Sequence, residues 1–213
     1  MEINNKKIIL ASSNKDKLKQ IKIYLDDLNL DIALPDYNID IKEGDKSLKD
    51  NAIKKALEYS RQYKRTIILA TDGGAKIPYL GSNWNHVMTK RLSGMDNNEI
   101  LSNRQRCDRL LGLMKKAMGE QRKVFWRESY AIAFDNKIIF CEEFYGDKGY
   151  LTASIPDNFE EASGFWIGYL WYVPKFEKNY MALSRAQKKK LKSPGEKFSH
   201  KLKTQRILNE LLK

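Results

Sequence analysis

Continuous apolar runs and helically spaced apolar positions predict a strand followed by a helix at the start of the chain. Lys7–Ser12 contains the unbroken apolar run Ile8-Ile9-Leu10-Ala11, which is typical of a buried strand. Ser12-Ser13-Asn14 supplies residues that cap helix N-termini, so a helix is expected from there to about Asp27. One face of this helix carries apolar residues at helical spacing, namely Leu18, Ile21 and Leu25.

The same alternation continues further along the chain. Extended chain with turn signals is expected over Asp31–Lys46, and Ser47 then caps a second helix with Asp50 as its capping-box acid. The apolar face of that helix consists of Ala52, Ile53, Ala56 and Leu57. Thr66–Ala70 predicts a second buried strand, which Thr71-Asp72-Gly73-Gly74 is expected to end abruptly.

The middle of the chain changes from helical to extended patterning. A long helix is expected from about Asn97 to Met118, with its inward positions at Ile100, Leu101, Leu110, Leu111 and Met114. Val124–Phe134 and Lys137–Phe144 are rich in strand-forming residues and meet at Asp135-Asn136, a pattern that predicts a hairpin.

The last third combines short extended segments with helices. Tyr150–Ser154 is expected to add a further strand, before a glycine-containing loop that leads to the aromatic run Trp171-Tyr172-Val173. Two helices are expected to close the chain, at about Ala182–Lys192 and Ser199–Leu212, with Ser193-Pro194-Gly195 between them.

This order of elements predicts an α/β fold. Strand–helix alternation followed by a long antiparallel section favours a mixed, twisted sheet with helices on both faces. We expect one domain over residues 1–213, with a second lobe at roughly 123–175 and a central ligand-binding cleft between two lobes.

Composition is consistent with a soluble protein that has a sizeable core. The 213 residues are 42% hydrophobic, and no run approaches the roughly 20 apolar residues of a membrane span. The N-terminus lacks the apolar stretch of a signal peptide, so a cytoplasmic location without membrane association is expected. The two cysteines, Cys107 and Cys141, are far apart and are expected to be reduced packing residues.

The net charge of +12 favours anionic partners, which include nucleotides, nucleic acid and acidic membrane surfaces. Lysine and arginine greatly outnumber glutamate between Lys175 and Lys213. A solvated basic helix face and a role in holding phosphate are equally open readings of this segment.

Two stretches have the composition of anion-binding sites. Ser12–Lys17 lies at a strand-to-helix turn, where backbone N–H groups and lysines favour an anion. Asn51 and Lys55 are four residues apart and so share a helix face, just after Glu43 in a loop. Taken singly, each stretch would look the same in an ordinary capped or amphipathic surface helix.

Asp72 is a candidate for metal chemistry. It follows an apolar strand and precedes two glycines, the first of which is Gly73, and ligands in α/β folds bind at the carboxyl ends of strands. Asp72 and Glu43 together have the oxygen chemistry that Mg²⁺ prefers. The alternative is an aspartate that only forms a turn.

Ser199-His200-Lys201 is expected at the head of the last helix, where His200 has the capacity to donate a hydrogen bond to a base or a phosphate. A lone surface histidine is the commoner outcome for such a residue.

These four stretches occur in the order and spacing of a known family. The chain resembles the inosine/xanthosine triphosphate pyrophosphatases, which remove non-standard purine nucleotides. Their T-G-N-x-x-K pattern resembles Ser12–Lys17, and their E-T-G-x-T-F-x-E-N-A-x-x-K-A pattern resembles Glu43–Ala56, one residue shorter at its start. Their A-D-D-S-G motif is similar to Ala70–Gly74, with the second acid at Asp72.

Three further motifs extend the resemblance over essentially the whole chain. The family's S-A-R-Y-x-G pattern resembles Thr89–Gly94, which places its arginine at Arg91. G-F-G-Y-D-P-I-F-F-V-P resembles Gly164–Pro174, with Phe165 in the place of the base-stacking aromatic residue, and S-H-R resembles Ser199–Lys201.

The chain departs from the family pattern mainly where the base is read. Thr71 replaces the first acid of the Asp pair, and the motif's Asp and Pro are Gly168 and Tyr169. Lys201 replaces an arginine, and lysine cannot reproduce the two-pronged guanidinium contact. Gly195 stands where the family has a lysine. Either Lys197 or Lys189 takes the place of that lysine, or no residue does.

The resemblance implies a nucleoside triphosphate diphosphatase that converts (d)NTP to (d)NMP and pyrophosphate, acts on non-standard purines such as (d)ITP and XTP, and has altered base selectivity. Glu43 and Asp72 would hold Mg²⁺, Lys17 and Lys55 would neutralise phosphate oxygens, and Asp72 would act on the attacking water. Phe165 or Trp166 would stack on the base, and His200 with Lys201 would contact its edge. Further substrate contacts are expected from Ser12, Asn14, Asn51, Gly73, Arg91, Lys197 and Ser199. A homodimer is also implied.

Two other functions remain open on the sequence. The Maf-type nucleotide pyrophosphatases begin with L-A-S-x-S, which resembles Leu10–Asn14, although their following Arg pair is replaced by Lys15-Asp16-Lys17. Alternatively, the chain is a degenerate, non-catalytic binder of nucleotides or nucleic acid, a function that Thr71, Gly168 and the basic C-terminal segment would suit. Nucleic acid is the less favoured ligand.

Overall fold

The computed structural model describes residues 7–95, 100–157, 159 and 165–204. The chain divides into two compact units, each of which gathers segments that are distant in sequence. Unit 1 comprises Met1–Gly73, Glu128–Phe144 and Lys192–Lys213, and unit 2 comprises Gly74–Arg127 and Tyr145–Leu191.

Hydrogen bonding joins seven strands of the described chain in the order β2-β1-β3-β4-β5-β6-β7. β1 pairs in parallel with both β2 and β3, whereas β6 pairs antiparallel with β5 and with β7. The sheet is therefore mixed, as the sequence predicts. The strands are β1 (Lys7–Leu10), β2 (Asp31–Ala33), β3 (Ile67–Lys76), β4 (Lys123–Phe134), β5 (Lys137–Leu151), β6 (Trp171–Val173) and β7 (Lys178–Asn179).

Five α-helices and several short 3₁₀ turns accompany these strands in the described part of the chain. The helices are α1 (Lys15–Tyr24), α2 (Leu48–Gln62), α3 (Asn103–Leu113), α4 (Arg185–Lys189) and α5 (Pro194–Thr204). The 3₁₀ turns include η1 (Asp26–Leu28), η2 (Pro78–Asn83), η3 (His86–Gly94), η4 (Gly119–Arg122), η5 (Trp166–Tyr169), η6 (Pro174–Phe176) and η7 (Tyr180–Ala182). None of the described helices is both long enough and apolar enough to cross a bilayer.

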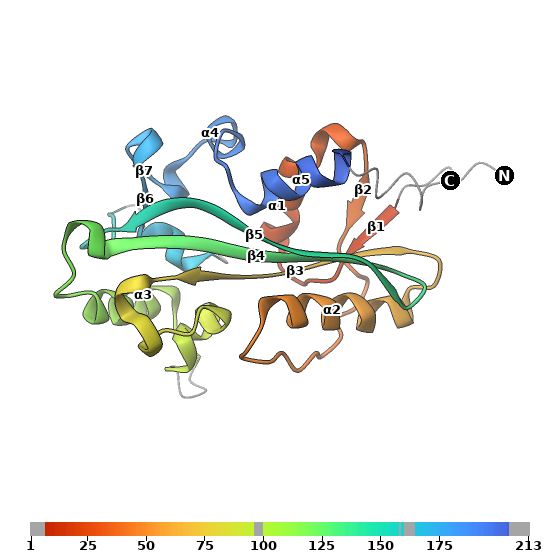
Figure 1. The fold of residues 1–213 in the computed structure, drawn as a ribbon, viewed down its shortest axis with the longest axis horizontal. Coiled ribbons are helices and arrows are strands. Elements are labelled where there is room, and N and C mark those ends of the chain that lie inside the picture. Colours follow the sequence, from red (N-terminus) through yellow and green to blue (C-terminus); the bar gives the residue numbers. More distant parts are fainter. Residues whose placement is uncertain (1–6, 96–99, 158, 160–164, 205–213) are drawn as a thin grey trace. The chain divides into compact units, whose positions relative to one another are not determined.

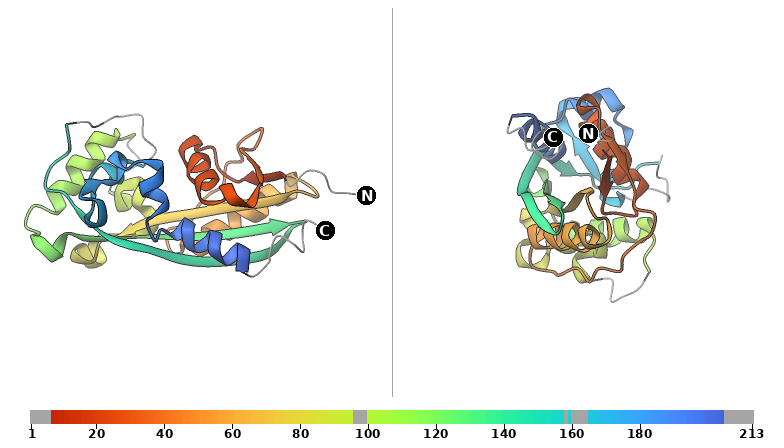
Figure 2. Two further views of the ribbon diagram at one scale, coloured as in Figure 1. Left: turned by 90° about the horizontal axis from the view of Figure 1, so that it is seen from above. Right: turned by 90° about the vertical axis from the view of Figure 1, so that its right-hand side faces the viewer.

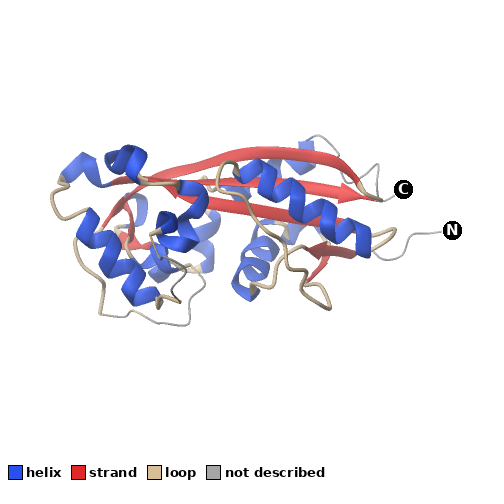
Figure 3. Cartoon of the chain, turned by 90° about the horizontal axis from the view of Figure 1, so that it is seen from below, coloured by secondary structure: helices blue, strands red, loops and turns tan. Residues whose placement is uncertain are grey.

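Unit 1 is a three-layered structure in which helices cover both faces of its strands (Figure 1). α1 and α5 pack on one face through Ile21, Phe198 and Leu202, whereas α2 packs on the other through small residues that include Ala52 and Ala56. Figure 3, drawn from below, shows α2 lying along the strands of this unit. The two faces give unit 1 two separate apolar cores.

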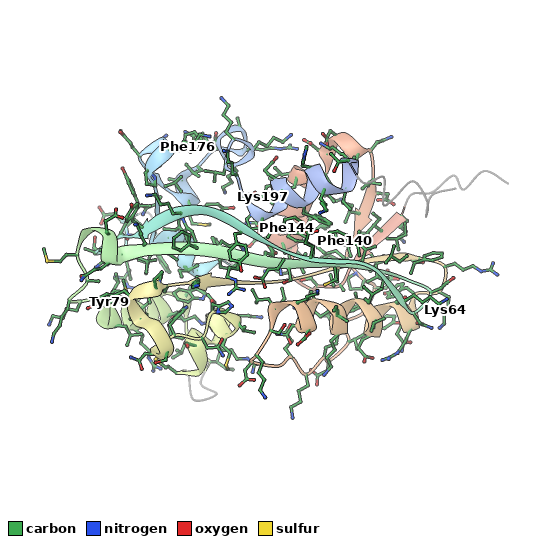
Figure 4. All side chains as sticks on the ribbon, viewed as in Figure 1. Lys64, Tyr79, Phe140, Phe144, Phe176 and Lys197 are labelled. Carbon is green, nitrogen blue, oxygen red and sulfur yellow. The ribbon has the colours of Figure 1, made fainter. Side chains whose placement is uncertain are left out.

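The face that carries α5 is rich in aromatic rings. Phe198 of α5 stacks on Tyr130 of β4, with centroids 4.2 Å apart, and also contacts Phe140 and Phe144 of β5. Figure 4 labels the two β5 rings below α5. Unit 2 has its own core, in which Trp84, Leu110 and Trp171 are among the buried residues.

Three local signals in the sequence are confirmed: the caps of α1 and α2 and the turn between β4 and β5. Asn14 caps α1, and Ser47 caps α2 by accepting from the Asp50 N–H. Asp135 and Asn136 have φ of 44° and 64°, the left-handed backbone of a two-residue hairpin turn between β4 and β5. Figure 2 shows these two strands running side by side.

The prediction that a turn ends the second strand at Thr71–Gly74 is wrong. β3 continues as far as Lys76, so Asp72 lies within a strand rather than after one. Gly74 serves close packing instead of a turn, because a Cβ there would lie 1.8 Å from the carbonyl oxygen of His86. In the same way β5 runs unbroken to Leu151, and the separate strand expected at Tyr150–Ser154 does not form.

The long helix expected from about Asn97 is also shorter than predicted. Ser102 caps α3 in a capping box with Gln105, which sets the helix start after Ile100. Ile100 is 100% exposed rather than inward, whereas Leu110 and Met114 are buried as predicted. The residues 97–99 lie outside the described part of the chain.

The last described helix begins earlier than expected. Ser193 accepts a hydrogen bond from the Glu196 N–H, and Pro194 occupies the first turn of α5, where its missing N–H costs nothing. Ser193-Pro194-Gly195 is therefore a helix start and not a linker, and Ser199-His200-Lys201 lies in the middle of α5 rather than at its head. The expected continuation to Leu212 falls outside the described residues, as does Gly164.

The stretch 123–175, expected as a second lobe, shares residues with both units, and the single domain stays a prediction. Neither Cys107 nor Cys141 forms a disulfide within the described residues, in agreement with the expectation of reduced cysteines.

Candidate functional site

The turn from β1 into α1 places Lys17 on the first turn of a well-capped helix. The Asn14 side chain accepts hydrogen bonds from the N–H groups of Asp16 (2.8 Å) and Lys17 (3.2 Å), and the Ser12 hydroxyl accepts one from the Asn14 N–H (3.1 Å). Asn14 and Ser12 therefore fix the helix start. The Lys17 ammonium nitrogen lies 3.4 Å from the carbonyl oxygen of Thr71 on β3.

The first two turns of α2 direct Asn51 and Lys55 toward β3. The Asn51 amide donates to the Gly44 carbonyl (3.0 Å) and to Asp72 Oδ2 (3.0 Å), and it accepts from the Gly44 N–H (2.8 Å). Asn51 thus ties the loop that carries Glu43 to the carboxylate of Asp72. The predicted helix face shared by Asn51 and Lys55 is confirmed.

Lys55 joins both predicted carboxylates. Its ammonium nitrogen lies 2.7 Å from Glu43 Oε1, 2.8 Å from Asp72 Oδ1 and 3.1 Å from the Thr71 carbonyl oxygen. Lys55 and Asp72 have side chains that are only 12% and 13% exposed, whereas Glu43 is 41% exposed. Glu43 and Asp72 therefore converge on one cation at the edge of a largely buried cluster.

Thr71 contributes its backbone and not its side chain. Its carbonyl oxygen accepts from both lysines, whereas its Oγ1 is buried without a hydrogen-bond partner in the described chain. Side chains alternate along a strand, so Thr71 projects to the sheet face covered by α1 and α5, and Asp72 projects to the face covered by α2. The two lysines meet the same carbonyl from opposite faces of the sheet.

Glu128 of β4 also belongs to this cluster, although no sequence motif contains it. Its Oε1 lies 4.0 Å from the Lys17 nitrogen, and its Oε2 accepts from the Tyr130 hydroxyl at 3.0 Å. In the sequence, Glu128 is marked only by the charged pair Arg127-Glu128, which interrupts the strand-forming pattern of Val124–Phe134. No local pattern indicates that Glu128 lies near Lys17.

The environment acts in opposite directions on the two lysines. Burial lowers the pKa of Lys17 below its usual value, with the charge of Glu128 opposing this effect. Burial also works to lower the pKa of Lys55, but the adjacent carboxylates of Asp72 and Glu43 outweigh it and raise the pKa above its usual value. Lys55 is therefore firmly held as a cation.

The charge balance and the donor atoms of the cluster fit a divalent cation that arrives with a phosphate ligand. Three carboxylates, from Glu43, Asp72 and Glu128, face two ammonium groups. No group of three His, Cys, Asp or Glu side chains in the described residues is arranged as a metal cage. Mg²⁺ does not need one, because it is commonly held by one or two carboxylates together with substrate phosphates and water.

The residues expected to contact the edge of the base lie on α5 of unit 1. Ser199 is buried within α5, His200 is exposed, and Lys201 pairs with Glu142 at 3.1 Å. Lys197 is exposed on the same helix, where Figure 4 labels it. Gly195 packs against the Tyr24 ring so closely that a Cβ would lie 2.1 Å from a ring carbon, so a lysine at this position would require α5 or the Tyr24 ring to move.

Gly73 lies in β3 of unit 1, next to Asp72, whereas Phe165, Trp166 and Arg91 lie in unit 2. Phe165 is half-buried and packs edge-on against Trp126 (4.9 Å between centroids), whereas Trp166 is only 4% exposed within the core. Phe165 is thus the more accessible of the two rings. Gly168 lies directly beside it, since a Cβ there would come within 2.5 Å of the Phe165 ring. Arg91 is exposed.

Comparison with known proteins gives one family. The sequence profile of the Ham1 family matches residues 8–206. A dITP/XTP pyrophosphatase of Clostridium perfringens is 28% identical over 211 residues, covering 93% of this chain and 98% of the relative. A dITP/XTP pyrophosphatase of Nautilia profundicola is also 28% identical and covers 97% of both chains.

Solved structures agree in fold. A HAM1 protein from Coxiella burnetii superimposes with a TM-score of 0.71 at 23% identity, over 96% of this chain and 98% of the other. The Staphylococcus aureus Ham1 protein gives a TM-score of 0.69 at 20% identity, over 96% and 99%. At these identities the likeness establishes the fold alone.

Proposed function

The chain belongs to the Ham1 family, and from this membership we propose that it hydrolyses nucleoside triphosphates to the monophosphate and pyrophosphate. The curated relatives named dITP/XTP pyrophosphatases, which match almost end to end, support purine triphosphates of the dITP and XTP type as substrates. The profile match over residues 8–206 favours this family over the Maf-type enzymes.

The observation that carries the proposal is the convergence on Lys55. Its ammonium group bonds both Glu43 and Asp72 while sharing the Thr71 carbonyl with Lys17. Two lysine cations thus share one carbonyl oxygen next to two carboxylates. The carboxylates suit a metal ion and the lysines suit a polyphosphate, which the carboxylates alone would repel.

We assign roles to the residues as follows. Lys17 and Lys55 bind phosphate oxygens and stabilise the charge that develops on them. Asp72 orients the attacking water and accepts its proton, because it is a nearly buried carboxylate fixed by Asn51 and Lys55. The water oxygen bonds to the α-phosphorus, and the bond from this phosphorus to the α,β-bridging oxygen breaks, so that pyrophosphate leaves.

Glu43 and Asp72 are the proposed ligands for Mg²⁺. When bound, the ion would neutralise phosphate charge and assist departure of pyrophosphate. Lys55 holds both carboxylates at one point, so that their geometry is set before the ion arrives.

Recognition of the base is proposed for Phe165, His200 and Lys201. Trp166 is the weaker candidate because its ring is buried. Ser12, Asn14, Asn51 and Gly73 frame the phosphate end through backbone and amide groups, whereas Arg91, Lys197 and Ser199 remain candidates for further substrate contacts. A cytoplasmic homodimer is the proposed state of the protein.

The test is a screen of pyrophosphate release. Purified protein is incubated with dITP, XTP, ITP and the four standard ribonucleoside triphosphates, with Mg²⁺ or with EDTA. We expect release from the inosine or xanthosine nucleotides with Mg²⁺ and none with EDTA. Tight nucleotide binding without product would instead establish a non-catalytic binder, the alternative that Thr71 and Gly168 favour. Release of pyrophosphate from pyrimidine nucleotides alone would overturn the substrate assignment.

A further inference from the structure

Lys17 is held more loosely than Lys55. Its nitrogen lies 3.4 Å from the Thr71 carbonyl and 4.0 Å from Glu128, whereas all three contacts of Lys55 are 3.1 Å or shorter. The Lys17 side chain also retains 25% exposure, about twice that of Lys55. Of the two ammonium groups, Lys17 therefore has the more room to meet a ligand, and its position depends on fewer short contacts.

No carboxylate of β3 faces Lys17. Thr71 projects to the α1 face of the sheet, but its hydroxyl is uncharged and has no partner among the described residues. Asp72 projects to the opposite face, where Lys55 and Asn51 already engage it. The carboxylate that contacts Lys17 comes from another strand.

Glu128 of β4 supplies that charge from a fixed position. It shares a sheet face with Tyr130, two residues further along the strand, whose hydroxyl donates to Oε2 and leaves Oε1 toward Lys17. The Tyr130 ring is itself clamped by stacking on Phe198. The Glu128 side chain is 13% exposed, so solvent screens it only weakly.

We propose that Glu128 is a positioning residue of the phosphate site: its carboxylate holds the Lys17 ammonium at the Thr71 carbonyl, oriented for a phosphate oxygen of the nucleotide. This inference rests on the proposed function. Glu128, which belongs to no sequence motif, would thus supply the negative charge that Thr71 does not provide.

Glu128→Gln removes the charge while keeping the shape and an acceptor for Tyr130. We expect KM for the best substrate to rise about tenfold with kcat changed less than about threefold, because Glu128 aligns Lys17 with the bound triphosphate, whereas Lys17 itself keeps the charge that it contributes in the transition state. The melting temperature should stay close to that of the wild type. Glu58→Gln, which removes an acid from the surface of α2, is the matched control and should leave KM unchanged.

A second substitution separates positioning from mere packing. Thr71→Asp in the Glu128→Gln background places a carboxylate on the same sheet face, and we expect it to recover most of the lost affinity. Thr71→Asn in that background has similar size without charge and should not. Tyr130→Phe frees Oε2 of Glu128 and should raise KM by about threefold, which provides a test should the glutamine variant fold poorly.

Binding of inorganic tripolyphosphate, measured by titration calorimetry, tests the inference without turnover. The dissociation constant should rise about tenfold in Glu128→Gln. Wild-type values of KM and of this constant in the variant would overturn the role of Glu128 and leave the proposed enzyme activity intact. Absence of turnover in the wild-type protein would overturn the enzyme, and the tripolyphosphate measurement would still decide the role of Glu128.

Discussion

The side-chain nitrogen of Lys55 lies 2.8 Å from Oδ1 of Asp72, a residue that is 17 positions away in the chain. The same nitrogen contacts Glu43, so one ammonium group organises both acids of the candidate site. The chemistry of the site can be tested at this junction.

Asp72→Asn should abolish most of the activity. The variant keeps the size of the side chain and removes the charge that would accept a proton from water. Pyrophosphate release should fall at least about a hundredfold, in keeping with the usual contribution of a general base. Circular dichroism would verify the fold, and activity within a few-fold of the wild type would exclude Asp72 as the base.

Lys55→Met should destabilise the protein and make it more responsive to Mg²⁺. Without the ammonium group, Glu43 and Asp72 repel each other at a largely buried site, and the free energy of unfolding should fall by about 3 kcal/mol. Added MgCl₂ should restore part of this loss, since a ligand of the folded state stabilises it. Urea unfolding with and without Mg²⁺ measures both effects. Lys54→Met, on the exposed side of the same helix, is the control and should stay within about 0.5 kcal/mol of wild type.

The two lysines predict opposite trends of stability with pH. The pKa of Lys55 is raised above 10.5, so its contribution is complete below pH 10.5 and is lost as the pH rises through its folded-state pKa. The pKa of Lys17 is lowered from 10.5, so between its folded-state pKa and 10.5 the unfolded chain binds more protons and stability increases with pH. The free energy of unfolding of Lys17→Met should therefore lack the increase with pH that the wild type shows below pH 10.5. That of Lys55→Met should lack the decrease that the wild type shows above pH 10.5. Urea unfolding between pH 8 and pH 11 decides, and parallel curves for all three proteins would contradict both assignments.

Gly195→Ala should loosen α5 from α1. The added Cβ would lie 2.1 Å from the Tyr24 ring, so the helix or the ring has to shift, at a cost of about 1–3 kcal/mol. Thermal unfolding measures the loss. Gly112→Ala in α3 meets nothing within 4 Å and should instead stabilise by about 0.5–1 kcal/mol, through helix propensity. Equal effects of the two substitutions would refute a steric role for Gly195.

Gly168→Ala should affect the reading of the base. A methyl group there would come within 2.5 Å of the Phe165 ring and within 3.0 Å of Met181 Sδ, which displaces the ring. If Phe165 stacks on the base, KM for the purine nucleotide rises, whereas the inhibition constant of tripolyphosphate, used as a competitor, is unchanged. Steady-state kinetics with both ligands separate base binding from phosphate binding, and a parallel loss of both would point to general disruption of unit 2.

Some predictions from the sequence failed because a local signal has more than one structural use. Gly73-Gly74 is a typical turn signal, but these residues continue β3, and Gly74 leaves space for the His86 backbone. Pro194-Gly195 is a typical linker signal, but Pro194 begins α5 and Gly195 packs against the Tyr24 ring. Glycine and proline are compatible with turns, helix starts and close packing alike. Which of these a given glycine or proline forms depends on the segments that pack against it in the folded protein.

Local sequence is enough to predict the caps at Asn14 and Ser47, the hairpin turn at Asp135-Asn136, and the shared helix face of Asn51 and Lys55, because each depends on hydrogen bonds or spacing within a few residues. Only the tertiary structure brought Glu43 and Asp72 to one ammonium group and Glu128 to Lys17. Strand pairing and helix packing create these contacts, and their partners lie too far apart in the chain for any local pattern to specify them.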